Sequence, residues 1–182
     1  MEKRILVLTG SPGVGKTTVL ARTVSALRGQ GVSVGGMFSR EVREDSSRIG
    51  FEIVDVTSAK VGWLAHVNRQ GGPQVGKYHV NLADLDSIGV QAINTAIERN
   101  DVVVIDEIGP MELFSGKFKE TAQKALESSK IVITVVHQKA QDKLVTDAKS
   151  RTDTQVFAVT TQNRETLHES VVEKAVAFLK KN

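Results

Sequence analysis

The sequence contains no cysteine in its 182 residues. Disulfide scaffolds, thiol redox chemistry, zinc ribbons and cysteine nucleophiles are therefore excluded. Aromatic residues are scarce, at 4% of the chain, which argues against the stacking platforms that bind single-stranded nucleic acids. No apolar run approaches the ~18 residues of a membrane span, and the run that follows Arg4 is too short for the core of a signal peptide. These absences predict a cytoplasmic protein with neither a membrane nor a nucleic acid as its partner.

An excess of charge of one sign is also missing. Lys and Arg total 24 against 21 acidic residues, a net charge of +3, and clusters of like charge are short. Nucleic-acid-binding proteins usually gather basic residues on one face, so a solvated surface of mixed charge is the favoured interpretation. The length, without repeats or Pro- or Ser-rich linkers, predicts a single domain over residues 1–182. We expect it to be a monomer.

Runs rich in Val and Ile alternate with helical patterns along the chain. Three of these runs, at 5–8, 102–105 and 131–136, are almost continuously apolar, which is typical of strands that helices cover on both faces of a parallel sheet. Strands that alternate with helices predict an α/β domain of three layers. The predicted strands are Arg4–Thr9, Val32–Arg40, Gly50–Val56, Val102–Asp106, Ile131–Val136 and Gln155–Thr160.

Apolar residues at helical spacing predict the helices between these strands. Leu20, Val24 and Leu27 form one stripe, and Gly29 and Gly31 end it. The other predicted helices are Asn81–Asn100, Leu113–Ser129, Asp142–Lys149 and a last one that begins near Asn163.

One stretch departs from the alternation of strands and helices. Residues Gly35–Val56 contain two strand patterns joined by the polar turn 44–48, which predicts an antiparallel pair. Residues Gly62–Val80 are rich in glycine and predict a loop or a short irregular strand. We expect this segment to flank the functional site, because loops around a rigid sheet carry specificity.

The strongest functional signal is a glycine-rich motif after the first predicted strand. It matches G-x-x-x-x-G-K-[ST] in full, and a helical pattern follows it. Glycines let backbone N–H groups point at phosphate oxygens, and the helix adds its positive N-terminal end. Lys16 is predicted to reach the β- and γ-phosphates, Thr17 to bind Mg²⁺ and the Thr18 N–H to contact the α-phosphate. The predicted nucleotide-binding residues are Gly10, Ser11, Pro12, Gly13, Val14, Gly15, Lys16, Thr17 and Thr18.

Two acidic residues, Asp106 and Glu107, follow the apolar strand at 102–105. The carboxyl end of a buried parallel strand is where open α/β sheets bind ligands. Asp106 is predicted to bind Mg²⁺ and the nucleotide together with Thr17. Glu107 is predicted to act as the general base, so the predicted catalytic residues are Lys16 and Glu107.

Phosphoryl transfer also calls for a positive group near the γ-phosphate. The candidates are Arg43, Arg48, Lys60, Arg151 and Arg164, and an ordinary surface position is the simpler interpretation for each of them. We favour Arg151 and Arg43, because both fall in polar loops. His137 follows a buried strand, which predicts a place at the ligand edge of the sheet without a chemical role.

The segment 106–115 resembles the Walker B signature of the small P-loop nucleoside-triphosphatases, the family of the thermophile enzymes and the cancer-related nucleoside-triphosphatase. Further matching blocks run through the chain. They are Gly36 with Ser39, Glu41 and Arg43, then 48–51, 75–80, 149–151 with Asp153, 156–157, and 159–160 with Asn163 and Arg164. Pro110, Met37 and Gln162 depart from the pattern, and Pro110 removes a lysine that is common in the family.

The resemblance implies slow, Mg²⁺-dependent hydrolysis of several nucleoside triphosphates, ATP and GTP included, to the diphosphate and phosphate. It also implies a RecA-like sheet in which another strand separates the strand before the P-loop from the strand that carries Asp106.

Two other functions stay open on the residues alone. A small nucleotide or metabolite kinase would use the same phosphate cradle with a second substrate in the loop Gly62–Val80 or His137–Arg151. A nucleotide-dependent switch module would hydrolyse slowly and respond to a partner. Turnover with and without added acceptors separates the kinase from the hydrolase, and acceleration by a partner would favour the switch.

Overall fold

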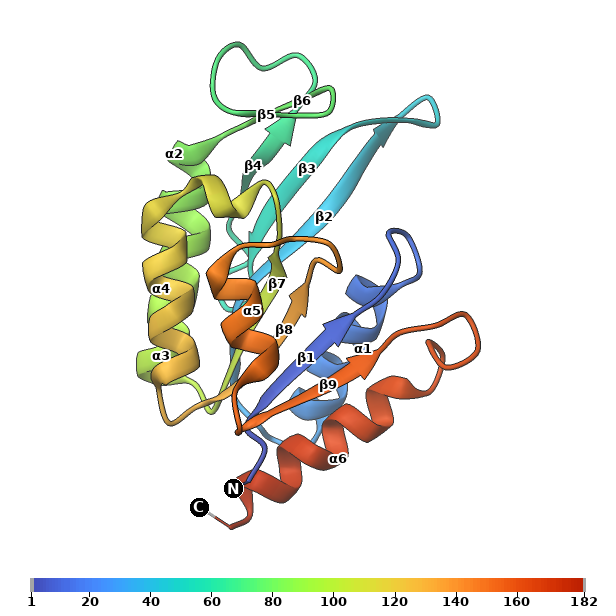
Figure 1. The fold of residues 1–182 in the computed structure, drawn as a ribbon, viewed down its shortest axis with the longest axis vertical. Helices are drawn as coiled ribbons and strands as arrows, with labels where there is room; N and C mark the ends of the chain where they lie inside the picture. The colour runs from blue at the N-terminus through green and yellow to red at the C-terminus, as the bar shows by residue number, and fades with distance from the viewer. Residues whose placement is uncertain (1, 182) are drawn as a thin grey trace.

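The computed structural model describes residues 2–181, and a mixed sheet of nine strands runs through them (Figure 1). The strand order is β5-β6-β4-β3-β2-β7-β8-β1-β9. None of the helices in this described part combines the length and apolarity needed to cross a membrane. The strands are β1 (Ile5–Thr9), β2 (Val34–Glu44), β3 (Ser47–Asp55), β4 (Val61–His66), β5 (Gln74–Val75), β6 (Tyr78–Val80), β7 (Val102–Ile108), β8 (Ile131–Val136) and β9 (Thr154–Ala158). The helices are α1 (Lys16–Gly29), α2 (Leu82–Asp84), the π-helical turn η1 (Leu85–Val90), α3 (Gln91–Arg99), the 3₁₀ turn η2 (Glu112–Phe114), α4 (Gly116–Glu127), α5 (Lys143–Ser150) and α6 (Leu167–Leu179).

Strands β2, β7, β8, β1 and β9 form the parallel half of the sheet. Their apolar runs are buried because helices cover both faces. Ile5 and Val7 belong to the core under α3, α4 and α5, whereas Leu6 and Leu8 belong to the core under α1 and α6. Strand β8 separates β1 from β7, as the family resemblance implies. The prediction of a three-layer α/β fold is confirmed.

Strand β2 joins the two halves of the sheet. Its first residues pair with β7 in parallel, and the strand then continues into the predicted antiparallel pair with β3. Gly36 permits the close approach to β7, because a Cβ at this position would lie 2.0 Å from the carbonyl oxygen of Val104. The β2–β3 hairpin projects beyond the carboxyl edge of the parallel strands and so forms one wall above it (Figure 1).

The prediction of a loop or irregular strand for Gly62–Val80 is wrong in its first part. Strand β4 has six residues and pairs with β3 in antiparallel fashion. The glycines that suggested a loop, Gly71, Gly72 and Gly76, lie beyond this strand. Gly62 within it serves close packing, because a Cβ on Gly62 would lie 2.4 Å from Cδ1 of Ile88 in the covering helix. Packing of this kind overrides the weak strand propensity of glycine.

Helix limits differ from the predicted ones where polar side chains bind the backbone. The predicted helix Asn81–Asn100 is the continuous segment α2–η1–α3. Ser115 divides the predicted helix Leu113–Ser129, because its hydroxyl accepts a hydrogen bond from the Phe118 N–H at 3.0 Å and caps α4. The last helix begins at Leu167, because the side chain of Asn163 accepts a hydrogen bond from the Thr160 N–H (2.8 Å) in a separate turn.

Candidate active site

The glycine-rich motif forms the turn between β1 and α1. Gly13 and Gly15 have φ angles of 76° and 112°, which residues with a Cβ rarely adopt. Helix α1 begins at Lys16, so its unpaired N-terminal N–H groups lie at this turn. The Lys16 ammonium folds back across the turn and donates hydrogen bonds to the backbone oxygens of Gly10 and Ser11, both at 3.0 Å. Backbone donors and one cation therefore converge, as phosphate binding requires.

Asp106 lies at the carboxyl end of β7 and reaches the P-loop. Its side chain is buried, with a residue exposure of 1%, and it accepts hydrogen bonds from the Thr17 hydroxyl and the Ser39 N–H. The other oxygen, Oδ2, is buried without a hydrogen-bond partner among residues 2–181. Burial, followed by the charge of Glu107, raises the pKa of Asp106 to about 7. A buried carboxylate oxygen left without a donor, beside a hydroxyl, is a donor set that suits a hard cation.

Glu107 lies in an irregularity of β7, where the register against β8 shifts between Asp106 and Ile108. Irregularities of this kind re-aim side chains beside active sites, and here both acids line the same pocket. Burial raises the pKa of Glu107, whereas the charges of Lys16 and His137 act in the opposite direction. The Glu107 carboxyl therefore lies within electrostatic reach of the P-loop cation.

A third acid, Glu112, was missed as a candidate. It is 2% exposed, and burial together with the charges of Glu107 and Asp106 raises its pKa well above the usual value. Its only signal in the sequence is its position between the apolar neighbours Met111 and Leu113, where a surface acid is not expected.

These groups line a pocket of about 500 Å³ at the carboxyl edge of the sheet. It brings together most of the predicted P-loop residues with Asp106 and Glu107. Gly10, Ser11 and Val14 complete the turn behind it. His137 lies in the pocket wall, so its predicted place at the ligand edge is confirmed. The lining residues are Pro12, Gly13, Gly15, Lys16, Thr17, Thr18, Ser39, Arg40, Glu41, Arg48, Phe51, Leu64, Val75, Asp106, Glu107, Pro110, Met111, Glu112 and His137.

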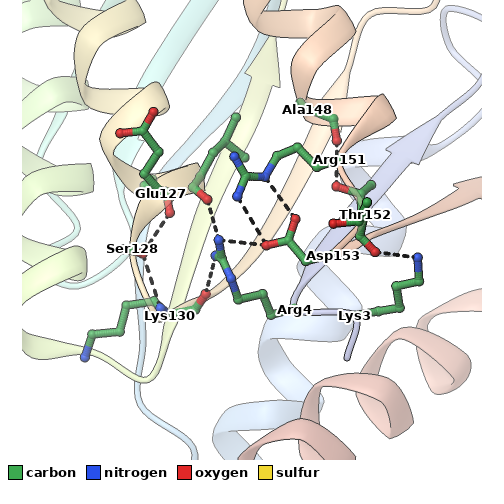
Figure 2. Close-up of polar contacts among 12 residues, drawn as sticks. Lys3, Arg4, Glu127, Ser128, Lys130, Ala148, Arg151, Thr152 and Asp153 are labelled. Carbon is green, nitrogen blue, oxygen red and sulfur yellow. Dashed lines mark hydrogen bonds and ion pairs between the residues drawn. The ribbon is translucent and has the colours of Figure 1, made fainter. Parts of the chain in front are cut away.

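The preference for Arg151 as the positive group is wrong. Its guanidinium binds the Asp153 carboxylate at 3.0 and 3.3 Å (Figure 2). The backbone oxygen of Asp153 accepts hydrogen bonds from the N–H groups of Arg4 and Ile5 at the start of β1. Arg151 therefore lies at the amino edge, opposite the pocket. The reason is topological, because helix α5 returns the chain from the carboxyl edge to the amino edge before β9 begins.

The other basic candidates divide between the pocket and its surroundings. Arg48 lines the pocket. Arg43 lies at the tip of the β2–β3 hairpin, where it binds Glu41 and the Ser46 oxygen, outside the lining residues. Arg164 packs against the outer side of the P-loop, with Cδ 3.5 Å from the position of a Cβ on Gly15. Lys60 lies in the β3–β4 turn, where its backbone oxygen accepts from Asp55, near the amino edge.

A glycine-rich strand–helix turn and an acidic strand end, separated by one strand of a parallel sheet with helices on both faces, define the class of P-loop NTPases. The chain belongs to the NTPase family, whose model matches residues 5–172. It is 44% identical over 168 residues to the nucleoside-triphosphatase THEP1 of Thermofilum pendens, a match that covers 92% of each chain.

Two solved structures share the fold. The crystal structure of THEP1 from the hyperthermophile Aquifex aeolicus superimposes with a TM-score of 0.81 at 26% identity, over 93% of this chain and 97% of that one. The solution structure of a human cancer-related nucleoside triphosphatase gives a TM-score of 0.79 at 34% identity, over 93% and 96% of the two chains. The family resemblance drawn from the sequence is therefore confirmed, and the protein is an enzyme of the nucleoside-triphosphatase type.

Proposed function

We propose that this enzyme hydrolyses nucleoside triphosphates, ATP and GTP included, to nucleoside diphosphate and phosphate in a Mg²⁺-dependent reaction with a broad base range. The observation that carries the proposal is the shared pocket of the P-loop and the two acids of β7. The names of the relatives support the reaction class. The cytoplasmic location and the monomeric state stay predictions of the sequence.

Substrate binding is assigned to the turn from Gly10 to Thr18. Its backbone N–H groups and the start of α1 would bind the phosphates. Lys16, which hydrogen-bonds two carbonyl oxygens in the structure, would exchange them for β- and γ-phosphate oxygens. Gly13 and Gly15 supply the positive φ angles by which the turn would direct its N–H groups at the phosphates.

The residues present suit a magnesium ion. Thr17 and Asp106 already share a hydrogen bond, and Asp106 Oδ2 is buried without a donor. Mg²⁺ is usually held by one or two protein oxygens together with substrate phosphates, so Thr17 and Asp106 form a sufficient protein contribution. When bound, the ion would neutralise charge on the phosphate oxygens.

Glu107 is assigned the role of general base. It would accept a proton from the attacking water, and its raised pKa brings it closer to neutrality, where a carboxylate is a more effective base. Lys16 would meet the negative charge that spreads over the γ-phosphoryl oxygens.

A broad base range is expected because the assigned groups all address phosphate or metal. The test measures phosphate release from ATP, GTP, CTP and UTP with Mg²⁺ and after removal of Mg²⁺ by EDTA. We expect kcat/KM values within about two decades, ~3 kcal/mol, of one another, and loss of turnover in EDTA. A single active nucleotide, or full activity in EDTA, would contradict the proposal.

A further inference from the structure

The pocket continues past the two acids into the β2–β3 hairpin. Its P-loop end lies above β1, whereas its other end is lined by Arg48, Phe51 and Leu64 from β3 and β4. The strand order β4-β3-β2-β7-β8-β1 places four strand spacings between β1 and β3, about 19 Å at ~4.8 Å per spacing. The phosphates bound at the P-loop therefore leave the hairpin end, which we call the hairpin subsite, open.

The hairpin subsite lies on the γ-phosphate side of the substrate. Under the proposed function, the terminal phosphate faces Asp106 and Glu107 on β7, so the nucleoside extends away from β7 and from the hairpin. Glu107 then stands between the γ-phosphate and the hairpin subsite. This is the position of a second substrate in a phosphoryl-transfer enzyme.

Arg48 supplies a fixed positive charge to the hairpin subsite. Its Nε donates a hydrogen bond to the Tyr78 hydroxyl (2.7 Å), and Nη1 donates to Glu41 Oε2 (2.9 Å). The guanidinium carbon also lies 5.1 Å from the ring centre of Phe51 and 5.5 Å from that of Tyr78. Two hydrogen bonds and two rings leave little rotational freedom, so the side chain is already ordered for an anion.

The rest of the hairpin subsite is largely apolar. Phe51, Leu64 and Val75 line it from three strands, and Met111 lines it from the turn after β7. Phe51 and Tyr78 pack edge to face with ring centres 5.2 Å apart.

Arg40 and Glu41 line the pocket beside this apolar part, with Arg40 paired to Glu52. Glu41 is shared by Arg43 and Arg48, so this group of three side chains keeps one net positive charge. A largely apolar surface beside a net positive charge matches a ligand that has an anionic group and an apolar or aromatic body.

We infer that the hairpin subsite binds a small organic anion with an apolar or aromatic body and a hydroxyl group, and that this ligand accepts the γ-phosphoryl group in place of water. The inference rests on the proposed function of the P-loop end. The acceptor hydroxyl oxygen forms a bond to the γ-phosphorus while the bond from that phosphorus to the β–γ bridging oxygen breaks. The bridging oxygen leaves with the electron pair on the nucleoside diphosphate, and the hydroxyl proton passes to the Glu107 carboxylate. A nucleophile that carries a proton is favoured because the carboxylate of Glu107, a base, lies between the γ-phosphate and the hairpin subsite.

The experiment follows the label from γ-³²P-ATP in the full-length enzyme. The probes are nucleoside 3′- and 5′-monophosphates in one arm and aliphatic and aromatic hydroxycarboxylates in the other. Labelled free phosphate reports hydrolysis, and labelled organic phosphate reports transfer. We expect transfer in at least one arm, and the arm identifies whether the anion is a phosphate or a carboxylate.

Two variants and one control locate the transfer. In Arg48→Ala, the ratio of labelled organic phosphate to free phosphate is expected to fall about tenfold or more, the loss of one charge-assisted contact. Val75→Trp fills the hairpin subsite from a short edge strand and is expected to lower the same ratio. In Arg43→Ala, which removes the other arginine bound to Glu41, the ratio is expected to stay within twofold.

Free phosphate without organic phosphate in both arms overturns the inference and leaves the proposed function standing. Equal ratios in Arg48→Ala, Val75→Trp and wild type overturn it as well. Absence of both labelled products would overturn the proposed function itself.

Discussion

At the amino edge of the sheet, Asp153 lies between two arginines (Figure 2), whereas at the carboxyl edge Asp106 lies beside two further acids. Both aspartates are buried, at 7% and 1% exposure. Burial alone would raise the pKa of Asp153, but the hydrogen bond from Arg151 and the charges of Arg4 and Arg151 outweigh it and lower that pKa. At Asp106, burial and the charge of Glu107 outweigh the hydrogen bonds from Thr17 and Ser39 and the charge of Lys16, which lower the pKa, so the pKa rises to about 7.

The difference separates a structural role from a chemical one. Arg4 binds Asp153 at 2.8 Å and also donates to the backbone oxygens of Leu126 and Lys130, so it ties β1 to the end of α4 (Figure 2). The charge of Asp153 is therefore paired within the protein, with Arg4 and Arg151. At the other edge, the missing partner is one that a cation and a substrate would supply. Variants at the carboxyl edge are therefore expected to change activity, and variants at the amino edge to change stability.

The largest effect is expected for Glu107→Gln. The glutamine keeps the size and hydrogen bonding of the side chain but cannot accept the proton, so turnover is expected to fall roughly 10²–10⁴-fold. Binding of the triphosphate with Mg²⁺ is expected to persist, as measured by calorimetric titration. Asp106→Asn is the matched variant, and its Mg²⁺-dependent binding is expected to weaken as well. Near-normal hydrolysis by Glu107→Gln would move the base elsewhere, with His137 as the next residue to test.

Lys16→Ala is expected to lower kcat/KM by about 10²–10³-fold, the value of one group that stabilises transition-state charge. Its ammonium contacts carbonyl oxygens of the turn rather than the apolar core, so the melting temperature is expected to change little. A folded Lys16→Ala protein with unchanged turnover would refute the P-loop assignment.

Asp153→Ala tests the other edge. It leaves Arg4 and Arg151 without their buried partner, so the free energy of unfolding is expected to fall by about 3 kcal/mol. The kcat of the folded protein is expected to stay within twofold, because Asp153 lies opposite the pocket. Glu165→Ala, which removes an exposed ion pair with Arg22, is the control, and no measurable loss of stability is expected because solvent screens that pair. A large loss of kcat in fully folded Asp153→Ala would contradict the assignment of stability to the amino edge and of activity to the carboxyl edge.

The smallest effect concerns stability against pH. Because the pKa of Asp106 is raised in the folded state, that state binds the extra proton between about pH 4 and pH 7, and stability falls as pH rises through this window. Asp106→Asn removes one such group, so the slope of the free energy of unfolding against pH is expected to become shallower by up to about 1.4 kcal/mol per pH unit. Urea unfolding at several pH values measures it. The lowered pKa of Asp153 predicts the opposite sign, a loss of stability as pH falls below about 4. An unchanged slope in Asp106→Asn would show that Asp106 is ionised throughout.

Local sequence was enough for the elements whose signals are local. The P-loop, the apolar runs of β1, β7 and β8 and the antiparallel pair of β2 and β3 were all predicted, because turn chemistry and apolar patterning act over a few residues. Strand β4 was not predicted as a regular strand, because the loop signal of Gly71, Gly72 and Gly76 was extended over the whole segment Gly62–Val80. The start of α6 was misplaced because the Asn163 turn competes with the helix for the same backbone groups.

The phosphate-binding turn, the acidic end of β7 and the α/β class follow from local sequence, because each depends on neighbours along the chain. Which charges meet depends on the folded arrangement. It buried Glu112 beside Asp106 and Glu107, directed Arg48 into the pocket and returned Arg151 to the opposite edge. The physical reason is that a side chain's burial and its electrostatic partners depend on strand order and on the edge at which each loop emerges. Both are set by contacts between residues far apart in the chain.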